Sequence, residues 1–264
     1  MRTENAAFIS FDNQFPGVVF DDSNHENYPI TYYNVHSGEG IDPQENCSYF
    51  GFIYEGIADL TTPQGFAATL KDGSYYSHSG LHSLGGCYKA IVIEVYNEKG
   101  MYAKQGFKAV TTAGGPIESK GRLKYIDGCT DSLLIAPVKK GDPCLNHLHF
   151  PIAITQTAHT HPSHRIGIVA KGEGLCVTPF GKLPLTKGMI FVIKEYNGVD
   201  KAIGIDGQEY EAGTHCFFTY ENSMDVIAFH PDSDFGPEDE NHPMINRTIV
   251  GGVSANRLDH IKTK

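Results

Sequence analysis

The sequence contains no tryptophan and no apolar run near the ~18 residues that a membrane-spanning helix requires. Its first ten residues carry one arginine and no long apolar stretch, unlike a secretory signal. The six cysteines are far apart and form no Cys-x-x-Cys pair. We therefore expect no membrane partner, a cytoplasmic location, and free, mostly buried thiols.

Basic charge is also scarce, since the net charge is −10 and the isoelectric point is about 5.7. Lys139-Lys140 is the densest basic pair outside the last few residues. A nucleic-acid-binding protein normally presents a basic face, so we predict no nucleic-acid partner. The sequence has no phosphate-binding P-loop, no dinucleotide-binding Gly-x-Gly-x-x-Gly between a strand and a helix, and no Gly-x-Ser-x-Gly nucleophile motif.

Long helical periodicity is missing too. No window longer than about 12 residues keeps an apolar i, i+3, i+4, i+7 pattern without a glycine or proline. Short β-type runs recur instead, separated by turn residues such as Lys71-Asp72-Gly73 and Asn97-Glu98-Lys99-Gly100. This spacing predicts an all-β protein built as a sandwich or barrel of antiparallel strands. The strand runs fall into two sets, at about residues 45–110 and 132–232.

The segment that carries chemistry is His159-Thr160-His161. Side chains alternate along a strand, so His-x-His places two imidazoles on one face, where both can bind one metal ion. Pro162 then bends the chain. A β-type run follows and leads into the turn Gly172-Glu173-Gly174.

These residues resemble the first motif of the cupin superfamily, which reads His-x-His, a glutamate a few residues later, then a glycine. His159, His161 and Gly172 match it, whereas Arg165 stands where the glutamate would fall. In cupins a later strand supplies one more histidine. The resemblance implies that this is His215, with His230 as the competing candidate.

The resemblance implies a bicupin, that is, two double-stranded β-helix (jelly-roll) barrels with the metal in the second. Residues 48–110 echo the barrel pattern without the His-x-His. The expected parts are an N-terminal arm packing on the barrels or a partner subunit (1–44), a degenerate cupin barrel (45–128), a metal-binding cupin barrel (129–235) and a C-terminal wrap over it (236–264).

Several other residues are candidates for the site. Arg165 could bind the carboxylate or phosphate of a substrate in bidentate fashion, or could pair with an acid of the barrel. Gln156 could serve as a neutral oxygen ligand, whereas His164 is expected to lie outside the ligand set. Substrate contacts are expected from His147 and His149, a second His-x-His, and from Arg247 or Asp234. No catalytic residue is assigned.

Three functions follow from the resemblance. The first is a non-heme Fe(II) dioxygenase acting on a small anionic organic substrate, because imidazole suits iron and open positions suit oxygen chemistry. The second is a sugar-acid isomerase or ureidoglycine-type hydrolase that uses Zn or Mn; Ni is a further candidate metal. The third is a non-catalytic small-molecule-binding cupin. The resemblance also implies a homodimer.

Overall fold

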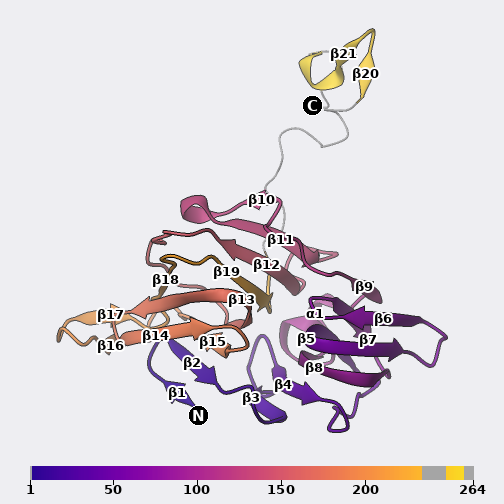
Figure 1. The fold of residues 1–264 in the computed structure, drawn as a ribbon, viewed down its shortest axis with the longest axis horizontal. Helices are drawn as coiled ribbons and strands as arrows, with labels where there is room; N and C mark the ends of the chain where they lie inside the picture. The colour runs from indigo at the N-terminus through magenta and orange to yellow at the C-terminus, as the bar shows by residue number, and fades with distance from the viewer. Residues whose placement is uncertain (1, 234–247, 259–264) are drawn as a thin grey trace.

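The computed structural model describes residues 2–233 and 248–258 of the chain. These residues form two antiparallel β-barrels that lie side by side (Figure 1). Within these described residues, helical structure is limited to the helix α1 (Gly100–Gln105) and the short 3-10 turns η1 (Ile126–Gly128) and η2 (Ala255–Arg257). The prediction of an all-β protein is confirmed.

The N-terminal barrel is a seven-stranded sheet in the order β3-β4-β8-β5-β7-β9, with β6 also paired to β5. Its two long strands, β5 and β8, pair with each other along almost their whole length. The strands are β3 (Gly17–Asp22), β4 (Ile30–His36), β5 (Cys47–Thr61), β6 (Ala67–Lys71), β7 (Tyr75–Ser79), β8 (Ser83–Tyr96) and β9 (Thr112–Gly114).

The C-terminal barrel is a ten-stranded sheet in the order β1-β2-β15-β13-β19-β12-β11-β10, with β14 and β18 paired to β13. Its strands are β1 (Thr3–Glu4), β2 (Phe8–Phe11), β10 (Leu123–Lys124), β11 (Thr130–Ile135), β12 (Cys144–Phe150), β13 (Arg165–Thr178), β14 (Gly181–Thr186), β15 (Ile190–Ile193), β18 (Cys216–Phe218) and β19 (Met224–His230). A separate hairpin of β16 (Lys201–Ile203) and β17 (Glu209–Glu211) extends from it.

The N-terminal residues are divided between the two barrels. Strand β2 pairs with β15 of the C-terminal barrel, whereas β3 and β4 belong to the N-terminal barrel. Residues 1–44, expected to form an arm, thus supply strands to both sheets. Strand β2 has four buried residues, Phe-Ile-Ser-Phe, and so short a run carries no readable period.

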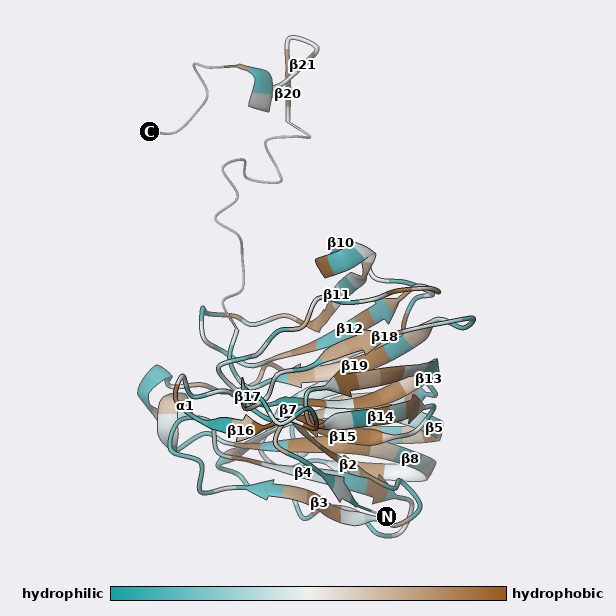
Figure 2. Ribbon diagram, turned by 90° about the vertical axis from the view of Figure 1, so that its left-hand side faces the viewer, coloured by the Kyte–Doolittle hydropathy of each residue, from teal (hydrophilic) through white to brown (hydrophobic). Residues whose placement is uncertain are grey.

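Three apolar cores hold the molecule together. One fills the N-terminal barrel and includes Tyr49 and Tyr76, and a second fills the C-terminal barrel and includes Phe150 and Val226. The third lies between the barrels, where the Phe50 and Phe229 ring centroids are 5.0 Å apart. Apolar segments recur along the strands (Figure 2).

Strand β19 shows how one sequence serves two of these cores. Val226 and Ala228 pack inside the C-terminal barrel, and Ile227 and Phe229 pack between the barrels. A strand buried on both faces reads as a continuous apolar run, as β19 does. The interior of the C-terminal barrel is thereby closed on the side of its neighbour.

The C-terminal segment contributes one short hairpin to the described residues. Its strands β20 (Ile249–Val250) and β21 (Val253–Ser254) pair with each other. Within residues 248–258 no strand joins either barrel sheet, and the hairpin lies apart from both barrels in Figure 1. Most of the residues expected to wrap over the second barrel, 236–264, lie outside the described ones, so this wrap stays a prediction. Arg247 and Asp234 lie outside the described residues.

Candidate metal centre

Two chain segments bring three histidines together inside the C-terminal barrel. His159 and His215 are joined by an isolated antiparallel bridge, with backbone N···O distances of 2.9 and 3.0 Å in the two directions. His161 follows two residues later, and its backbone oxygen accepts a hydrogen bond from Tyr196 N. The His-x-His precedes strand β13 instead of lying in it, yet its two ring centroids are only 4.9 Å apart.

Backbone carbonyls fix the tautomers of two of these rings. His159 Nδ1 lies 2.8 Å from Thr157 O, and His215 Nδ1 lies 2.9 Å from Gly213 O. A carbonyl oxygen only accepts, so each Nδ1 carries the proton and donates it. The Nε2 atom of each ring is left with its lone pair, as metal-binding histidines generally require.

His161 and His215 also resist protonation. Burial, followed by the charge of His159, lowers the pKa of His215 to about 3. Burial and then the nearby Arg165 lower the pKa of His161. Neutral imidazole is the form that binds a metal.

The ligand atoms of His159, His161 and His215 all lie within 4.8 Å of one another. A metal ion bound by all three rings would lie about 2.1 Å from each nitrogen. Small side-chain rotations would bring the three nitrogens to that distance. Three imidazoles without a carboxylate suit a transition metal such as Fe, Zn, Mn or Ni and leave coordination positions open. The donor set therefore fits the metal expected from the sequence.

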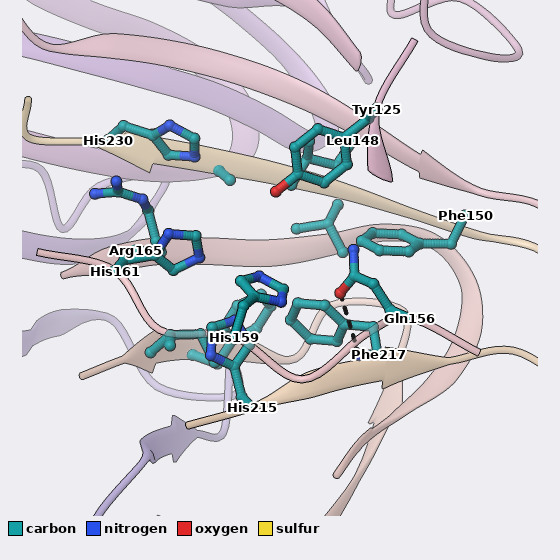
Figure 3. Close-up of a pocket in the computed structure, with 14 residues that line it drawn as sticks. Tyr125, Leu148, Phe150, Gln156, His159, His161, Arg165, His215, Phe217 and His230 are labelled. Carbon is teal, nitrogen blue, oxygen red and sulfur yellow. Dashed lines mark hydrogen bonds between the residues drawn. The ribbon is translucent and has the colours of Figure 1, made fainter. Parts of the chain in front are cut away.

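A small cavity of about 30 Å³ adjoins the three histidines. A water molecule needs roughly 10–15 Å³ of such a cavity. The cavity therefore holds only a few heavy atoms in this conformation. The wall is mostly apolar and includes Leu148, Phe150 and Phe217, while its polar members are Tyr125, Gln156, Arg165 and His230 (Figure 3). Among the described residues, none that lines the cavity is acidic.

Known structures share this architecture, although no family model and no curated protein matches the sequence. A cupin 2 conserved barrel domain protein from Leptotrichia buccalis aligns at 13% identity over 87% of this chain and 91% of that chain, with a TM-score of 0.52. The chain has the cupin fold, in two copies. Protein Ylba from E. coli gives a TM-score of 0.59 at 11% identity, over 87% and 93% of the two chains.

A third similar structure is an enzyme. The G106A mutant of salicylate 1,2-dioxygenase from Pseudoaminobacter salicylatoxidans aligns with this bicupin at 10% identity and a TM-score of 0.52. The alignment covers 76% of this chain and 69% of that chain. The prediction of a cupin fold is confirmed, and at these identities the likeness concerns the fold alone.

Arg165, at the position of the missing cupin glutamate, lies on the cavity wall and pairs with an acid of the barrel. Its Nη1 donates to Asp232 Oδ1 at 3.0 Å and also bonds the Ser163 hydroxyl, which in turn bonds Asp232. Its Nε is buried and has no hydrogen-bond partner within the described residues. The sequence analysis left open whether Arg165 pairs with a barrel acid or binds an anion. In the structure Arg165 forms the ion pair with Asp232, and its buried Nε still has no protein acceptor among the described residues.

His230 lines the cavity without joining the group of ligand atoms that contains His215. Asn146 Nδ2 lies 3.1 Å from His230 Nδ1 and can only donate, so this ring carries its proton on Nε2. Burial, and then Arg165, keep the pKa of His230 well below its usual value. His230 is thus a neutral hydrogen-bond donor, and Asn146 fixes it in that form.

Gln156 is buried against the cavity, and its Oε1 accepts a hydrogen bond from Phe217 N at 3.3 Å. Its side chain points into the cavity from the side of Phe150 and Phe217 (Figure 3). The structure thus brings Gln156, Arg165 and His230 to the cavity beside the three histidines.

His164 turns away from the metal centre toward the N-terminal barrel, where it could ligate a metal together with Asp22 and His25. Its Nδ1 accepts from Glu195 N at 2.9 Å, and His25 Nδ1 accepts from Tyr28 N at 2.9 Å. Each Nε2 therefore carries a proton and faces a carboxylate, at 3.4 Å for His164 and Asp22 and at 3.1 Å for His25 and Glu195. This pattern favours a hydrogen-bonded contact between the barrels over a metal site.

His147 and His149, expected to contact substrate, lie on the opposite face of β12 from the cavity-lining Leu148. Both rings share one carboxylate oxygen, Asp225 Oδ1, at 2.7 and 2.8 Å. They are therefore not brought to the metal centre. The side-chain alternation of β12 decides this, because an odd-numbered residue of this strand faces outward when Leu148 faces inward.

The sequence analysis missed two residues of the C-terminal barrel, of which Tyr125 lines the cavity and Asp131 does not. Tyr125 lies in the segment between the barrels, where no motif marks it. Asp131 on β11 is paired in register with Leu148 and so faces the barrel interior. Burial raises the pKa of Asp131 to about 6, and its Oδ1 has no hydrogen-bond partner within the described residues. The alternation of β11 could have indicated Asp131 only if the register with β12 had been known.

Two further predictions concern the cysteines and a membrane-spanning helix. All six cysteines are free, as predicted from their spacing. No helix among the described residues is both long enough and apolar enough to cross a membrane.

Proposed function

We propose that the C-terminal barrel is a mononuclear metal enzyme, a non-heme Fe(II) dioxygenase acting on a small anionic organic substrate. The observation that carries this proposal is the convergence of three imidazoles, from His159, His161 and His215, beside a cavity that no carboxylate of the described residues lines. Bound iron would supply the chemistry by accepting substrate and dioxygen at neighbouring open positions.

The residues around the cavity favour an anion. With no lining carboxylate to offset the metal charge, a negative ligand gains electrostatic energy in a poorly solvated site. Arg165 Nε and His230 Nε2 would donate hydrogen bonds to its oxygens. The buried Arg165 Nε has no protein partner among the described residues, and Asn146 leaves the His230 proton on Nε2. The apolar wall would exclude water, and the cavity size favours a substrate of few heavy atoms.

One observation supports the alternative of a Zn- or Mn-dependent isomerase or hydrolase. Asp131 faces the barrel interior with a pKa of about 6 and an unpartnered oxygen. A carboxyl group with a pKa near the working pH is suited to move protons as a general acid and base.

Metal analysis separates these proposals. Untagged wild-type protein should retain about one metal per chain, and the His159→Ala, His161→Ala double variant should retain none. Iron, with oxygen consumption on a panel of enols, thiols and hydroxy acids, would support the dioxygenase. Zinc or manganese without oxygen uptake would favour the alternative, and equal metal content in the two proteins would overturn both.

The cellular setting is also a proposal. Six free thiols suit the reducing cytoplasm. We further propose a homodimer, to be tested by light scattering; a monomer at micromolar concentration would contradict it.

A further inference from the structure

Tyr125 reaches the metal cavity from the segment that connects the barrels. It directly precedes the turn η1, and its ring packs against the core of the C-terminal barrel. Figure 3 shows its hydroxyl pointing into the cavity toward the three histidines. The hydroxyl has no hydrogen-bond partner among the described residues, although the residue lines the cavity.

The turn that carries Tyr125 is tied to a metal-ligating histidine. Tyr125 N donates to Cys129 O at 2.9 Å, which closes the turn. Asp127, at a φ of 54°, accepts a hydrogen bond from Thr157 N at 2.6 Å. Thr157 O in turn accepts the Nδ1 proton of His159 at 2.8 Å. One chain of hydrogen bonds thus holds the Tyr125 turn and the His159 ring in a fixed relation.

The hydroxyl is a donor that faces no protein acceptor. Burial raises the pKa of Tyr125, so the phenol keeps its proton. Gln156 Oε1 already accepts one hydrogen bond, from Phe217 N, and a bound metal would take up the Nε2 lone pairs of His159 and His215. A ligand bound in the cavity would offer the hydroxyl an acceptor.

We propose that Tyr125 donates a hydrogen bond to an oxygen atom of the anion bound at the open position of the metal. Tyr125 is then a residue that contacts the ligand, and Asp127 is a residue that positions it through the turn. This inference rests on the proposed metal site, but not on whether the reaction there is oxidative or hydrolytic. It places a determinant of anion affinity in the inter-barrel segment, outside the motifs that carry the cupin resemblance.

The test uses the full chain loaded with Co(II), whose visible absorption reports changes in coordination. Acetate serves as the probe, titrated into wild-type, Tyr125→Phe and Tyr220→Phe proteins. Tyr220 is 65% exposed and is the matched control. Loss of one neutral hydrogen bond should weaken acetate binding about 5- to 10-fold in Tyr125→Phe. Cobalt affinity should be unchanged in both variants.

A thermodynamic cycle with Asp127 checks the positioning role. Asp127→Ala should weaken acetate binding in the wild-type background and have no further effect in Tyr125→Phe. Equal losses in both backgrounds would show that Asp127 does not act through Tyr125.

Three results would overturn the proposed role of Tyr125, and they can be told apart. If Co(II) binds but acetate affinity is the same in wild type and Tyr125→Phe, the inference is overturned while the metal site stands. A phenolate-to-metal charge-transfer band in the Cu(II) form, lost in Tyr125→Phe, would make Tyr125 a ligand and would also overturn it. If Co(II) does not bind to wild-type protein, the proposed function fails and the inference fails with it.

Discussion

Replacing Asp131 with asparagine should stabilise the protein at neutral pH. Asp131 faces the interior of the C-terminal barrel, and burial raises its pKa from 3.8 to about 6. At 1.36 kcal/mol per unit, a shift of about 2 units corresponds to ~3 kcal/mol. The side chain is only partly buried, so solvent screening reduces the expected gain to about 1–2 kcal/mol.

The sign follows from the protons bound in each state. Between pH 4 and 6, on the order of these two pKa values, the folded state holds a proton on Asp131 that the unfolded state has lost. The stability contributed by that proton is present below about pH 4 and disappears as the pH rises to about 6. Asp131→Asn should therefore match wild type at pH 4 and exceed it at pH 7.

The assay is urea unfolding of both proteins across this pH range. Asp72→Asn, which removes an exposed carboxylate, is the control and should track wild type throughout. If Asp131→Asn were less stable than wild type at pH 7, or if the difference were the same at every pH, the buried carboxyl would not be the unfavourable charge inferred here.

Three further outcomes can be checked on the same protein. Gly172→Ala should lower the free energy of unfolding by more than about 3 kcal/mol, because the new Cβ would lie 1.8 Å from Ser223 O. Gly207→Ala, with a similar φ but open space around it, should lower it by only about 1 kcal/mol in urea unfolding. Phe229→Ala should cost about 3–5 kcal/mol through the inter-barrel core, and equality with wild type would contradict that core. Adding Fe(II) or Zn(II) at ~100 times its dissociation constant should stabilise wild type by ~2.7 kcal/mol in thermal melts, and the same shift in His161→Ala would argue against the ligand set.

The sequence determined the features that depend on local spacing. Alternating apolar residues between turn residues gave the all-β class, because the strand period is a property of neighbouring residues. The two histidines of His159-Thr160-His161 lie together in the structure because only one residue separates them, and Gly172 has a positive φ, as glycines of turns often do.

Only the tertiary structure decided which distant residues join them. His215 lies 54 positions beyond His161 in the sequence and is brought to the other two histidines by a backbone bridge to His159. His230 instead contacts Asn146, which leaves its ring a hydrogen-bond donor. Arg165 pairs with Asp232, and the Tyr125 side chain points into the cavity from a connecting segment that carries no motif. These contacts depend on strand register and barrel closure, in which a shift of one residue turns every side chain to the opposite face.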